Sequence, residues 1–323
     1  MPDTLWSRII GRGTLNEPEG KPDPTWALPS TLNWMHGMAL LTSGLDWKSA
    51  RGFYSQEGKR AVDDLAVNTT LEQLFLSLHH LSTLNALKNV QPADVGRIGV
   101  LAWYYGTSNA ASAMISAKAS QFQEDHSGTA RIWDLEIAKP GLAMEPFSWR
   151  VSSLVEATFK PEVSLLGDSS SGALQTKPLS EKQARDAAAS YLSGSAKWYA
   201  WKTQEEVRAS KEFKALGVKD FRKKVARDLR DQRLLKKPVG FMHQAMRYRG
   251  KANYREALFL AYGANTSASM SGFAESQESA LRAFLIMAGA YCSRKLGSDI
   301  WDEFVKDVET NHAFTLSPYG IWT

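Results

Sequence analysis

A helix with almost no bulk on one side constrains this chain more than any other feature of its sequence. In the stretch YYGTSNAASAMISAKA, Gly106, Ala110, Ala113 and Ala117 recur every three or four residues, which is the spacing of one helix face. Small side chains at that spacing let a second helix approach closely, while the bulkier residues between them supply apolar volume around the contact. We therefore interpret the small face as a packing surface and not as a ligand site.

Helical signals extend over most of the remaining chain. Thr69 and Glu72 match a capping box at the start of a leucine stripe with helical spacing, and a second capping box pattern begins at Ser180. Gly297 is placed to end a long helix near the C-terminus. The sequence predicts a mainly α protein, in which the small-residue helix packs against the C-terminal helical segment that leads to Trp301.

Changes in composition divide the chain into four parts. Residues 1–31 contain five prolines, which predicts an extended N-terminal arm. Residues 32–140 are expected to form the first part of a helical core. Residues 141–179 carry short β-branched and aromatic runs cut by proline, glycine and serine, which predicts a small β/loop insertion. Residues 180–323 are expected to form the second part of the helical core, including a basic helix.

The composition excludes several classes of protein. A single cysteine, Cys292, rules out an intrachain disulfide framework and a cysteine-based zinc site, and it suits a reducing cytoplasm. No apolar run reaches the length of about 18 to 20 residues that spans a bilayer, and the first twelve residues do not match a secretory signal. The familiar phosphate-loop, nucleophile-elbow and zinc-binding motifs are absent. We expect a cytoplasmic protein with no membrane contact, no metal and no cofactor.

The stretch KDFRKKVARDLRDQRLLKKP is the strongest candidate for a binding surface. It has nine basic and three acidic residues, and Phe221, Val225 and Leu229 form an apolar stripe on one side. The opposite side is strongly positive, which suits the phosphate backbone of DNA or RNA. The alternative is a solvated surface helix with no ligand. The candidate nucleic-acid-binding residues of this helix are Arg222, Lys223, Lys224, Arg227, Arg230, Arg233, Lys236 and Lys237.

Just upstream, the stretch KWYAWK sets aromatic rings between two lysines. Trp198 and Trp201 could stack on bases of a single strand, and we include them among the candidate nucleic-acid-binding residues. The alternative is a buried aromatic cluster with no contact to a ligand.

Two places contain candidate catalytic residues. His243 and Arg247 are four residues apart and share a helix face, so the imidazole could act as general acid or base on a phosphodiester while the guanidinium stabilises charge. Ion pairs with a neighbouring subunit are the structural alternative. His126 follows the small-residue helix, and its role is open between capping a helix and lining a pocket.

The stretch VLAWYYGTSNAASAMISAKASQFQEDHSGTARIW resembles the helix-and-loop core of the YaaC-like proteins and is similar to the wider HEPN superfamily. The matching residues are Tyr104, Tyr105, His126 and Gly128. The C-terminal stretch FLIMAGAYCSRKLGSDIWDEFV resembles the closing helices of the YaaC-like proteins. The resemblance implies an all-α, HEPN-like bundle, often dimeric, in a family linked to prokaryotic toxin and anti-phage systems.

One departure from the HEPN pattern bears on activity. The resemblance implies that an active ribonuclease has an arginine, four to six residues, and then a histidine. No histidine of this chain has an arginine at that spacing, although Lys236 and Lys237 precede His243 at the right interval. Lysine does not reproduce the fork of donors that guanidinium presents.

These observations favour a HEPN-related helical protein that binds nucleic acid through the basic helix. We expect it to work in a bacterial anti-phage defence or regulatory complex, with a protein partner or as a homodimer, and without a self-sufficient catalytic site. A metal-independent ribonuclease that uses His243 with Arg247, or His126, is the first alternative. The second is an interaction subunit of a multiprotein complex, whose N-terminal arm docks on a partner.

Overall fold

The computed structural model describes residues 24–61, 63–255, 257–262 and 266–323. Over these residues the protein is all-α, which confirms the predicted helical character of the chain. The described ranges contain no strand. The elements are, in chain order, α2 (Pro24–Leu41), α3 (Trp47–Phe53), α4 (Asp64–Leu87), α5 (Pro92–Ala119), α6 (His126–Trp133), the π-helical turn η1 (Asp134–Ala138), α7 (Glu156–Ser164), the 3-10 turn η2 (Ser171–Leu174), α8 (Glu181–Ala209), α9 (Lys211–Ala215), α10 (Lys224–Leu234), α11 (Phe241–Gly250), the turns η3 (Lys251–Arg255) and η4 (Ala257–Leu260), α12 (Thr266–Ser269), α13 (Phe273–Leu296), α14 (Ser298–Asn311) and α15 (Tyr319–Trp322).

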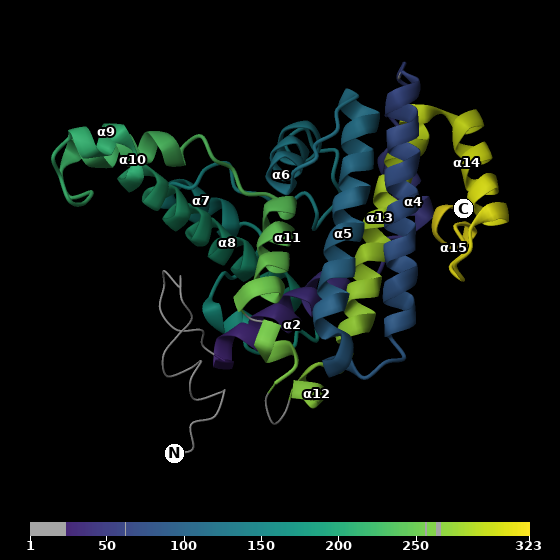
Figure 1. Ribbon diagram of the computed structural model, residues 1–323, viewed down its shortest axis with the longest axis horizontal. Helices are drawn as coiled ribbons and strands as arrows, with labels where there is room; N and C mark the ends of the chain where they lie inside the picture. Colours follow the sequence, from purple (N-terminus) through teal and green to yellow (C-terminus); the bar gives the residue numbers. More distant parts are fainter. Residues whose placement is uncertain (1–23, 62, 256, 263–265) are drawn as a thin grey trace.

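The long helices α4, α5 and α13 lie side by side and form the centre of the body (Figure 1). The small face of α5 makes this possible: a Cβ atom at Gly106 would lie 2.5 Å from Cδ2 of Leu281 on α13 and 3.0 Å from Cβ of His80 on α4. The Ser77 hydroxyl donates a hydrogen bond to the Gly106 carbonyl at 2.8 Å, which fastens α4 to the same point. The predicted contact between the small-residue helix and the C-terminal helical segment is therefore present.

The ends of α8 and α13 lie where local sequence signals predict them, whereas the start of α4 does not. The side chain of Ser180 accepts the backbone N–H of Gln183 at 3.3 Å, so α8 starts at its predicted cap. Gly297 ends α13 with φ +90°, a conformation that glycine adopts without strain. The predicted cap at Thr69 is wrong, because the Asp63 carboxylate accepts a first-turn N–H at 2.7 Å and α4 begins there.

A cluster of buried aromatic rings joins α2, α8, α11 and α5. Trp34 of α2 stacks on Tyr191 of α8, with ring centroids 4.2 Å apart and an interplanar angle of 17°. The same indole meets Tyr248 of α11 at 4.7 Å and Trp103 of α5 at 5.6 Å, edge to face. Such aromatic pairs contribute about 0.5–1.5 kcal/mol each beyond the area that they bury. This cluster holds α8 and α11 against the central helices.

The predicted extended N-terminal arm of residues 1–31 is wrong over its last part. Residues 1–23 lie outside the described residues, and α2 begins at Pro24. Proline at the start of a helix is compatible with helical geometry, because the first N–H groups have no intrahelical acceptor. Helix α2 also contains Pro29 within its second turn.

The predicted β/loop insertion of residues 141–179 forms no strand. Val151 pairs with Val239 in an isolated antiparallel bridge, with N···O distances of 2.9 and 3.1 Å. Helix α7 follows this bridge in the chain. In α7, Phe159 and Val163 lie four residues apart, and both are buried. The β-branched and aromatic residues therefore satisfy a helical period rather than an alternating one, and this overrides their strand propensity.

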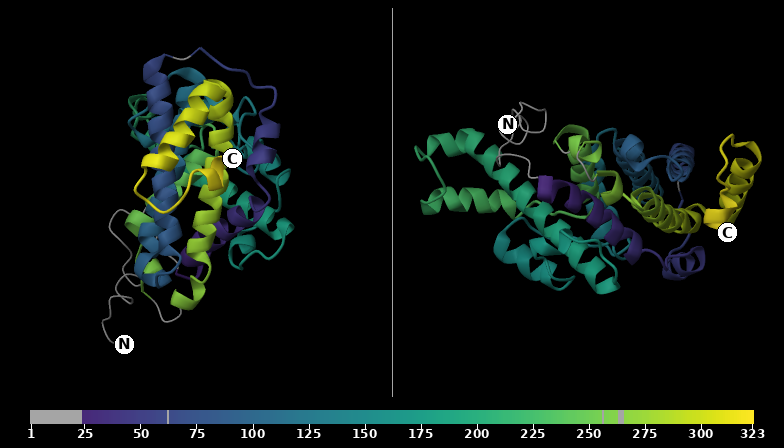
Figure 2. Two further views of the ribbon diagram at one scale, coloured as in Figure 1. Left: turned by 90° about the vertical axis from the view of Figure 1, so that its right-hand side faces the viewer. Right: turned by 90° about the horizontal axis from the view of Figure 1, so that it is seen from below.

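Helix α8 extends beyond the body and carries α9 and α10 with it (Figure 1). A second small core, separate from the main one, joins Val207, Phe213, Phe221 and Ala226. We call residues 197–237 the basic arm. Figure 1 and the view from below (Figure 2, right) place the arm and α14 at opposite ends of the molecule. No helix of the described residues has the length and hydropathy to cross a bilayer.

We expect Gly106→Ala to lower the free energy of unfolding by about 1–3 kcal/mol relative to Gly52→Ala, because the added methyl group overpacks the α4–α5–α13 contact. Both glycines are helical, and no atom lies within 4 Å of a Cβ placed at Gly52. The two changes add the same helix propensity, about 1 kcal/mol, so their difference isolates the contact. Urea denaturation measures it, and equal midpoints for the two variants would contradict close packing at Gly106.

Candidate nucleic-acid interface

Positive charge is concentrated in the basic arm. Residues 197–237 contain fourteen Lys and Arg against six Asp and Glu, a net charge of +8. The rest of the chain has 25 Lys and Arg against 28 Asp and Glu, a net charge of −3, although the whole chain is only +5. The arm is therefore a basic appendage on a mildly acidic body, which is a charge distribution that attracts polyanions to one end of the molecule.

Half of the predicted basic residues have an acidic partner. Arg222 lies 3.3 Å from Asp220, Arg230 lies 2.7 Å from Asp231, and Arg233 lies 3.7 Å from Glu212. Lys237 lies 2.7 Å from Glu206 and 3.2 Å from the Thr203 hydroxyl. The other half are exposed and have no acidic group within 4.0 Å among the described residues. These are Lys223, Lys224, Arg227 and Lys236.

Three of the unpaired cations lie together at the start of α10. Lys223 precedes the first helical residue, Lys224 is that residue, and Arg227 lies one turn further. The N-terminus of α10 adds its own partial positive charge. Since no acidic residue neutralises this end of the helix within its first turn, it is the part of the arm best suited to a phosphate backbone.

Arg230 has a structural role in the arm. Its guanidinium carbon lies 5.5 Å from the centroid of the Phe221 ring, and that of Arg208 lies 5.1 Å from the same ring. The two arginines thus lie over the core of the arm, where each cation–π contact contributes about 0.5–1 kcal/mol.

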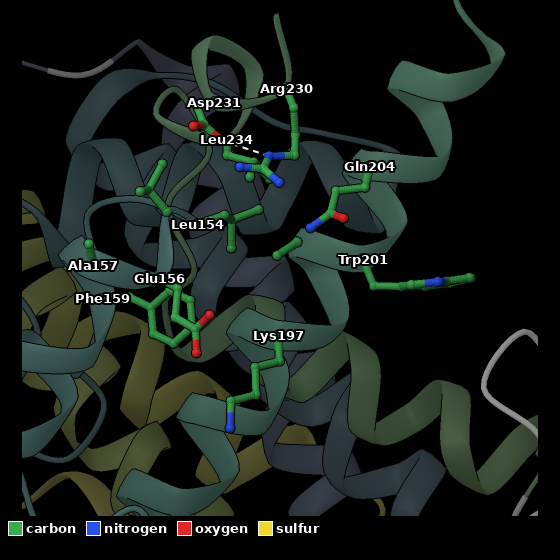
Figure 3. Close-up of a pocket in the computed structure, with 12 residues that line it drawn as sticks. Leu154, Glu156, Ala157, Phe159, Lys197, Trp201, Gln204, Arg230, Asp231 and Leu234 are labelled. Atoms are coloured by element: carbon green, nitrogen blue, oxygen red, sulfur yellow. Dashed lines mark hydrogen bonds and ion pairs between the residues drawn. The ribbon is translucent and has the colours of Figure 1, made fainter. Parts of the chain in front are cut away.

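A cavity of about 440 Å³ lies at the root of the arm, between α7, α8 and α10 (Figure 3). We call it the root cavity. Lys197, Gln204 and Arg230 supply polar groups to its wall, and Glu156 and Asp231 make the wall mixed in charge. The walls also include Leu154, Val155, Ala157, Phe159, Ala200, Trp201 and Leu234.

The two tryptophans that were predicted to bind nucleic acid line different cavities. In Figure 3 the indole of Trp201 extends away from Glu156 and Phe159 at the rim of the root cavity. Trp198 lines a second cavity of about 210 Å³ between α8 and α11, together with Arg247. Lys197 lines both cavities, so they adjoin along α8. The two tryptophans therefore line separate cavities.

The predicted catalytic residues His243 and Arg247 have different surroundings. Nδ1 of His243 accepts the backbone N–H of Gly240 at 3.2 Å, so the ring caps the start of α11. Burial lowers the pKa of His243 to about 4, while Asp134 raises it and Arg150 lowers it further. Arg247 instead donates to the Ser195 hydroxyl of α8 at 3.2 Å. A capped, neutral imidazole beside a buried ion pair is poorly suited to act as a general acid at neutral pH.

His126 belongs to a cluster of aromatic and basic side chains on α5, α6 and α11. Its ring lies 5.2 Å from that of Tyr104 and 5.7 Å from that of Tyr105. Arg249 of α11 contacts both tyrosines. Its guanidinium carbon lies 5.0 Å from the centroid of the Tyr104 ring, and its Nη1 donates to the Tyr105 hydroxyl at 3.4 Å. Partial burial lowers the pKa of His126, and the charge of Arg249 lowers it further.

The side chain that caps α6 is not His126. The Asp125 carboxylate accepts the backbone N–H of Gly128 at 2.7 Å and so caps the helix that His126 begins. The imidazole is left half-buried against Tyr104 and Tyr105. Of the two roles that the sequence leaves open, the helix cap therefore falls to Asp125.

Sequence reasoning did not connect Arg249 with His126. The two residues are 123 positions apart, and no local pattern links them. It also missed that Lys251 lines the same cavity as Arg247, although the spacing of four residues was a usable signal. The described residues contain no group of three or more His, Cys, Asp and Glu side chains placed to hold a metal ion.

Comparisons of the chain with protein-family models, with curated proteins and with solved structures found no match.

The lowered pKa of His243 makes stability depend on pH. The ring takes up a proton near pH 6.5 in the unfolded chain but only near pH 4 in the fold. Its contribution, about 3 kcal/mol, is therefore fully present above pH 6.5 and is lost as the pH falls through about 4. We expect His243→Asn, which keeps an acceptor for the Gly240 N–H, to flatten the fall in unfolding free energy between pH 7 and pH 4.5. Parallel curves for the two proteins in urea titrations would contradict this assignment.

Proposed function

We propose that this protein binds nucleic acid through the basic arm. The observation that carries the proposal is the segregation of charge, with net +8 on residues 197–237 and net −3 on the rest of the chain. A solvated surface helix does not require this arrangement, since scattered basic residues would keep the chain equally soluble. A phosphate backbone does require adjacent cations, because each contact releases condensed counterions from the polyanion.

The unpaired cations Lys223, Lys224, Arg227 and Lys236 are the residues that we assign to phosphate contacts. Arg222, Arg230, Arg233 and Lys237 have acidic partners and so offer less free charge. Contacts of this kind carry no base specificity, so the arm accepts RNA or DNA.

We further propose that the protein is a HEPN-related, YaaC-like helical component of a bacterial anti-phage defence or regulatory complex, acting in the cytoplasm with a protein partner or as a homodimer. The all-α fold of the described residues supports this proposal, because an all-α bundle is what the resemblance implies. The proposed role needs no self-sufficient catalytic site, because binding is the function assigned to the arm.

Reversing the charge of Lys223, Lys224 and Arg227 together to Glu is expected to weaken binding to a 30-mer RNA and to a 30-bp duplex DNA about 10- to 100-fold at low salt. The slope of log K against log[salt] should fall in magnitude by about two to three, because each phosphate that the variant no longer neutralises removes about one from the slope. Fluorescence anisotropy over a salt series measures both quantities.

The matched control changes Lys48, Lys139 and Lys306 to Glu. These lysines are exposed on the body, and the change in net charge is the same. The control should bind with the wild-type salt slope. Equal losses of affinity in the two triple variants would show that only the overall charge matters, and the arm would then be an ordinary solvated surface.

A metal-independent ribonuclease is the second candidate function, and the contact of His126 and Arg249 with the same tyrosine favours it. A neutral His126 would take the proton from a 2′-hydroxyl as its oxygen attacks the adjacent phosphorus, and the displaced 5′-oxygen would take a proton from water. The guanidinium of Arg249 would stabilise the added negative charge. His243 is less suited to this role because its Nδ1 already accepts the Gly240 N–H.

The ribonuclease candidate predicts that transfer and messenger RNA are cut in the presence of EDTA. His126→Ala and Arg249→Ala should each slow cleavage at least about 100-fold, since a positioned general base contributes that much. The rate should fall as the pH drops through the His126 pKa, which lies below 6.5. His79→Ala, which changes an exposed histidine that stacks on Phe314, serves as the control. RNA that stays intact with excess wild-type protein rules this activity out.

A further inference from the structure

The root cavity has an apolar wall that suits the flat face of a ring. Leu154 precedes α7, Phe159 belongs to α7 and Leu234 belongs to α10, and all three line the cavity and are buried. The volume of about 440 Å³ lies within the range of about 300–1,000 Å³ that small-molecule sites have. The cavity can therefore take up a group of the size of a nucleobase and remove its faces from water.

The charges on the wall of the root cavity balance one another. Two cations, Lys197 and Arg230, and two carboxylates, Glu156 and Asp231, line it. Glu156 lies 2.8 Å from Nζ of Lys160, and the Asp231 carboxylate accepts the Nε–H of Arg230 at 2.7 Å. Because the wall has no net charge and both carboxylates have partners, the cavity favours a neutral polar ligand over a phosphate or a cation.

The amide of Gln204 supplies the cavity with an unused donor and an unused acceptor. Lys197, Ala200, Trp201 and Gln204 share one face of α8 at helical spacing. Gln204 is half-buried, and its amide makes no hydrogen bond with a residue in the described part of the chain. Figure 3 shows this amide pointing toward Leu154 across the cavity. A glutamine amide contacts N6 and N7 of adenine with its carbonyl and its N–H, so its position favours that base.

Exposed cations of the basic arm flank the root cavity. Arg227 precedes Arg230 and Asp231 by three and four residues, so it extends the cavity-lining face of α10 by one turn, about 5.4 Å. Lys197 lies at the opposite end of the cavity from Arg230 (Figure 3). Arg227 and Lys197 are both exposed and have no acidic group within 4.0 Å among the described residues. A strand can therefore cross the rim with its phosphates near these two cations and one base turned inward.

We propose that the root cavity takes up one unpaired base, with adenine preferred, from a single strand whose phosphates contact the basic arm. The faces of the base lie against the apolar wall, and its edge meets the amide of Gln204. Single-stranded nucleic acid is then the ligand class of this protein, because a base in a duplex must leave the stack before it can enter a cavity. The inference rests on the proposed function of the arm, since the phosphate contacts bring the strand to the rim.

Fluorescence anisotropy with three 12-residue ligands tests the site on the full chain. The ligands are oligo(dA), an abasic strand with the same number of phosphates, and the duplex of oligo(dA) with oligo(dT). Oligo(dA) should bind at least about tenfold more tightly than the abasic strand, because the buried base contributes that much. It should also bind more tightly than the duplex. Phosphate contacts alone predict the reverse order, since the duplex has the higher charge density.

Two variants locate the effect in the cavity. Ala200→Phe fills the cavity without a change in charge, so oligo(dA) and the abasic strand should bind alike while the affinity for the duplex stays the same. Gln204→Leu should abolish a wild-type preference of at least about fivefold for oligo(dA) over oligo(dT), because it removes the contacts to the edge of the base. Circular dichroism and the thermal midpoint check that each variant is folded.

Gln232→Leu is the matched control for Gln204→Leu. Gln232 is an exposed glutamine of α10 that does not line the root cavity. This variant should show the wild-type preference for oligo(dA) over both the abasic strand and oligo(dT).

The proposal is overturned if the abasic strand binds as tightly as oligo(dA), or if Ala200→Phe leaves the wild-type preference unchanged. In either case the arm proposal still stands when the reversal of Lys223, Lys224 and Arg227 weakens the binding of all three ligands. Failure of the arm proposal looks different, because that reversal would then leave the binding of every ligand unchanged, including the abasic strand.

Discussion

The stack of Trp34 on Tyr191 is the contact on which the arrangement of α2 and α8 depends. It forms where α2 crosses α8 closely, since a Cβ at Gly37 would lie 3.3 Å from the Ala184 carbonyl. The Tyr191 ring takes part in the core on one side and meets the guanidinium of Arg247 on another. The same packing that closes the core therefore positions a cation beside a cavity. Because α8 runs without interruption from this stack into the basic arm, it also sets the direction of the arm.

The arm can be so basic because it has a core of its own. Phe213 and Phe221 pack with two small aliphatic residues, and two arginines lie over the Phe221 ring. Because α10 packs on this small core with one side only, its other side is exposed to solvent. Cations gathered there repel one another, which costs stability, and the acidic partners of Arg230 and Lys237 offset part of that repulsion. The cations at the start of α10 have no such partners, and this is the pattern expected of a surface that meets an external polyanion.

Much of the fold was predictable because its signals are local. The small face of α5, the cap at Ser180 and the end of α13 at Gly297 each depend on residues within a turn or two of one another. The errors arose where a local preference competes with packing. Phe159 and Val163 have strand propensity, but their spacing of four residues buries both from one helix face. The error at Thr69 has a local cause instead, because Asp63 lies further upstream and satisfies a first-turn N–H of α4 there.

The sequence by itself determined that the chain is helical, that one helix has a face of small residues on which a second helix can pack closely, and that residues 219–237 carry a positive helix face. These properties follow from the period of the helix and from side-chain size and charge, which act between near neighbours. Only the tertiary structure decided that Arg249 meets the tyrosines beside His126, that Arg247 and Lys251 share a cavity with Lys197, and that His243 is a capping residue. Those groupings join residues from different helices, and which helix faces meet depends on how large side chains fill the space between them, a property of the whole core rather than of any one segment.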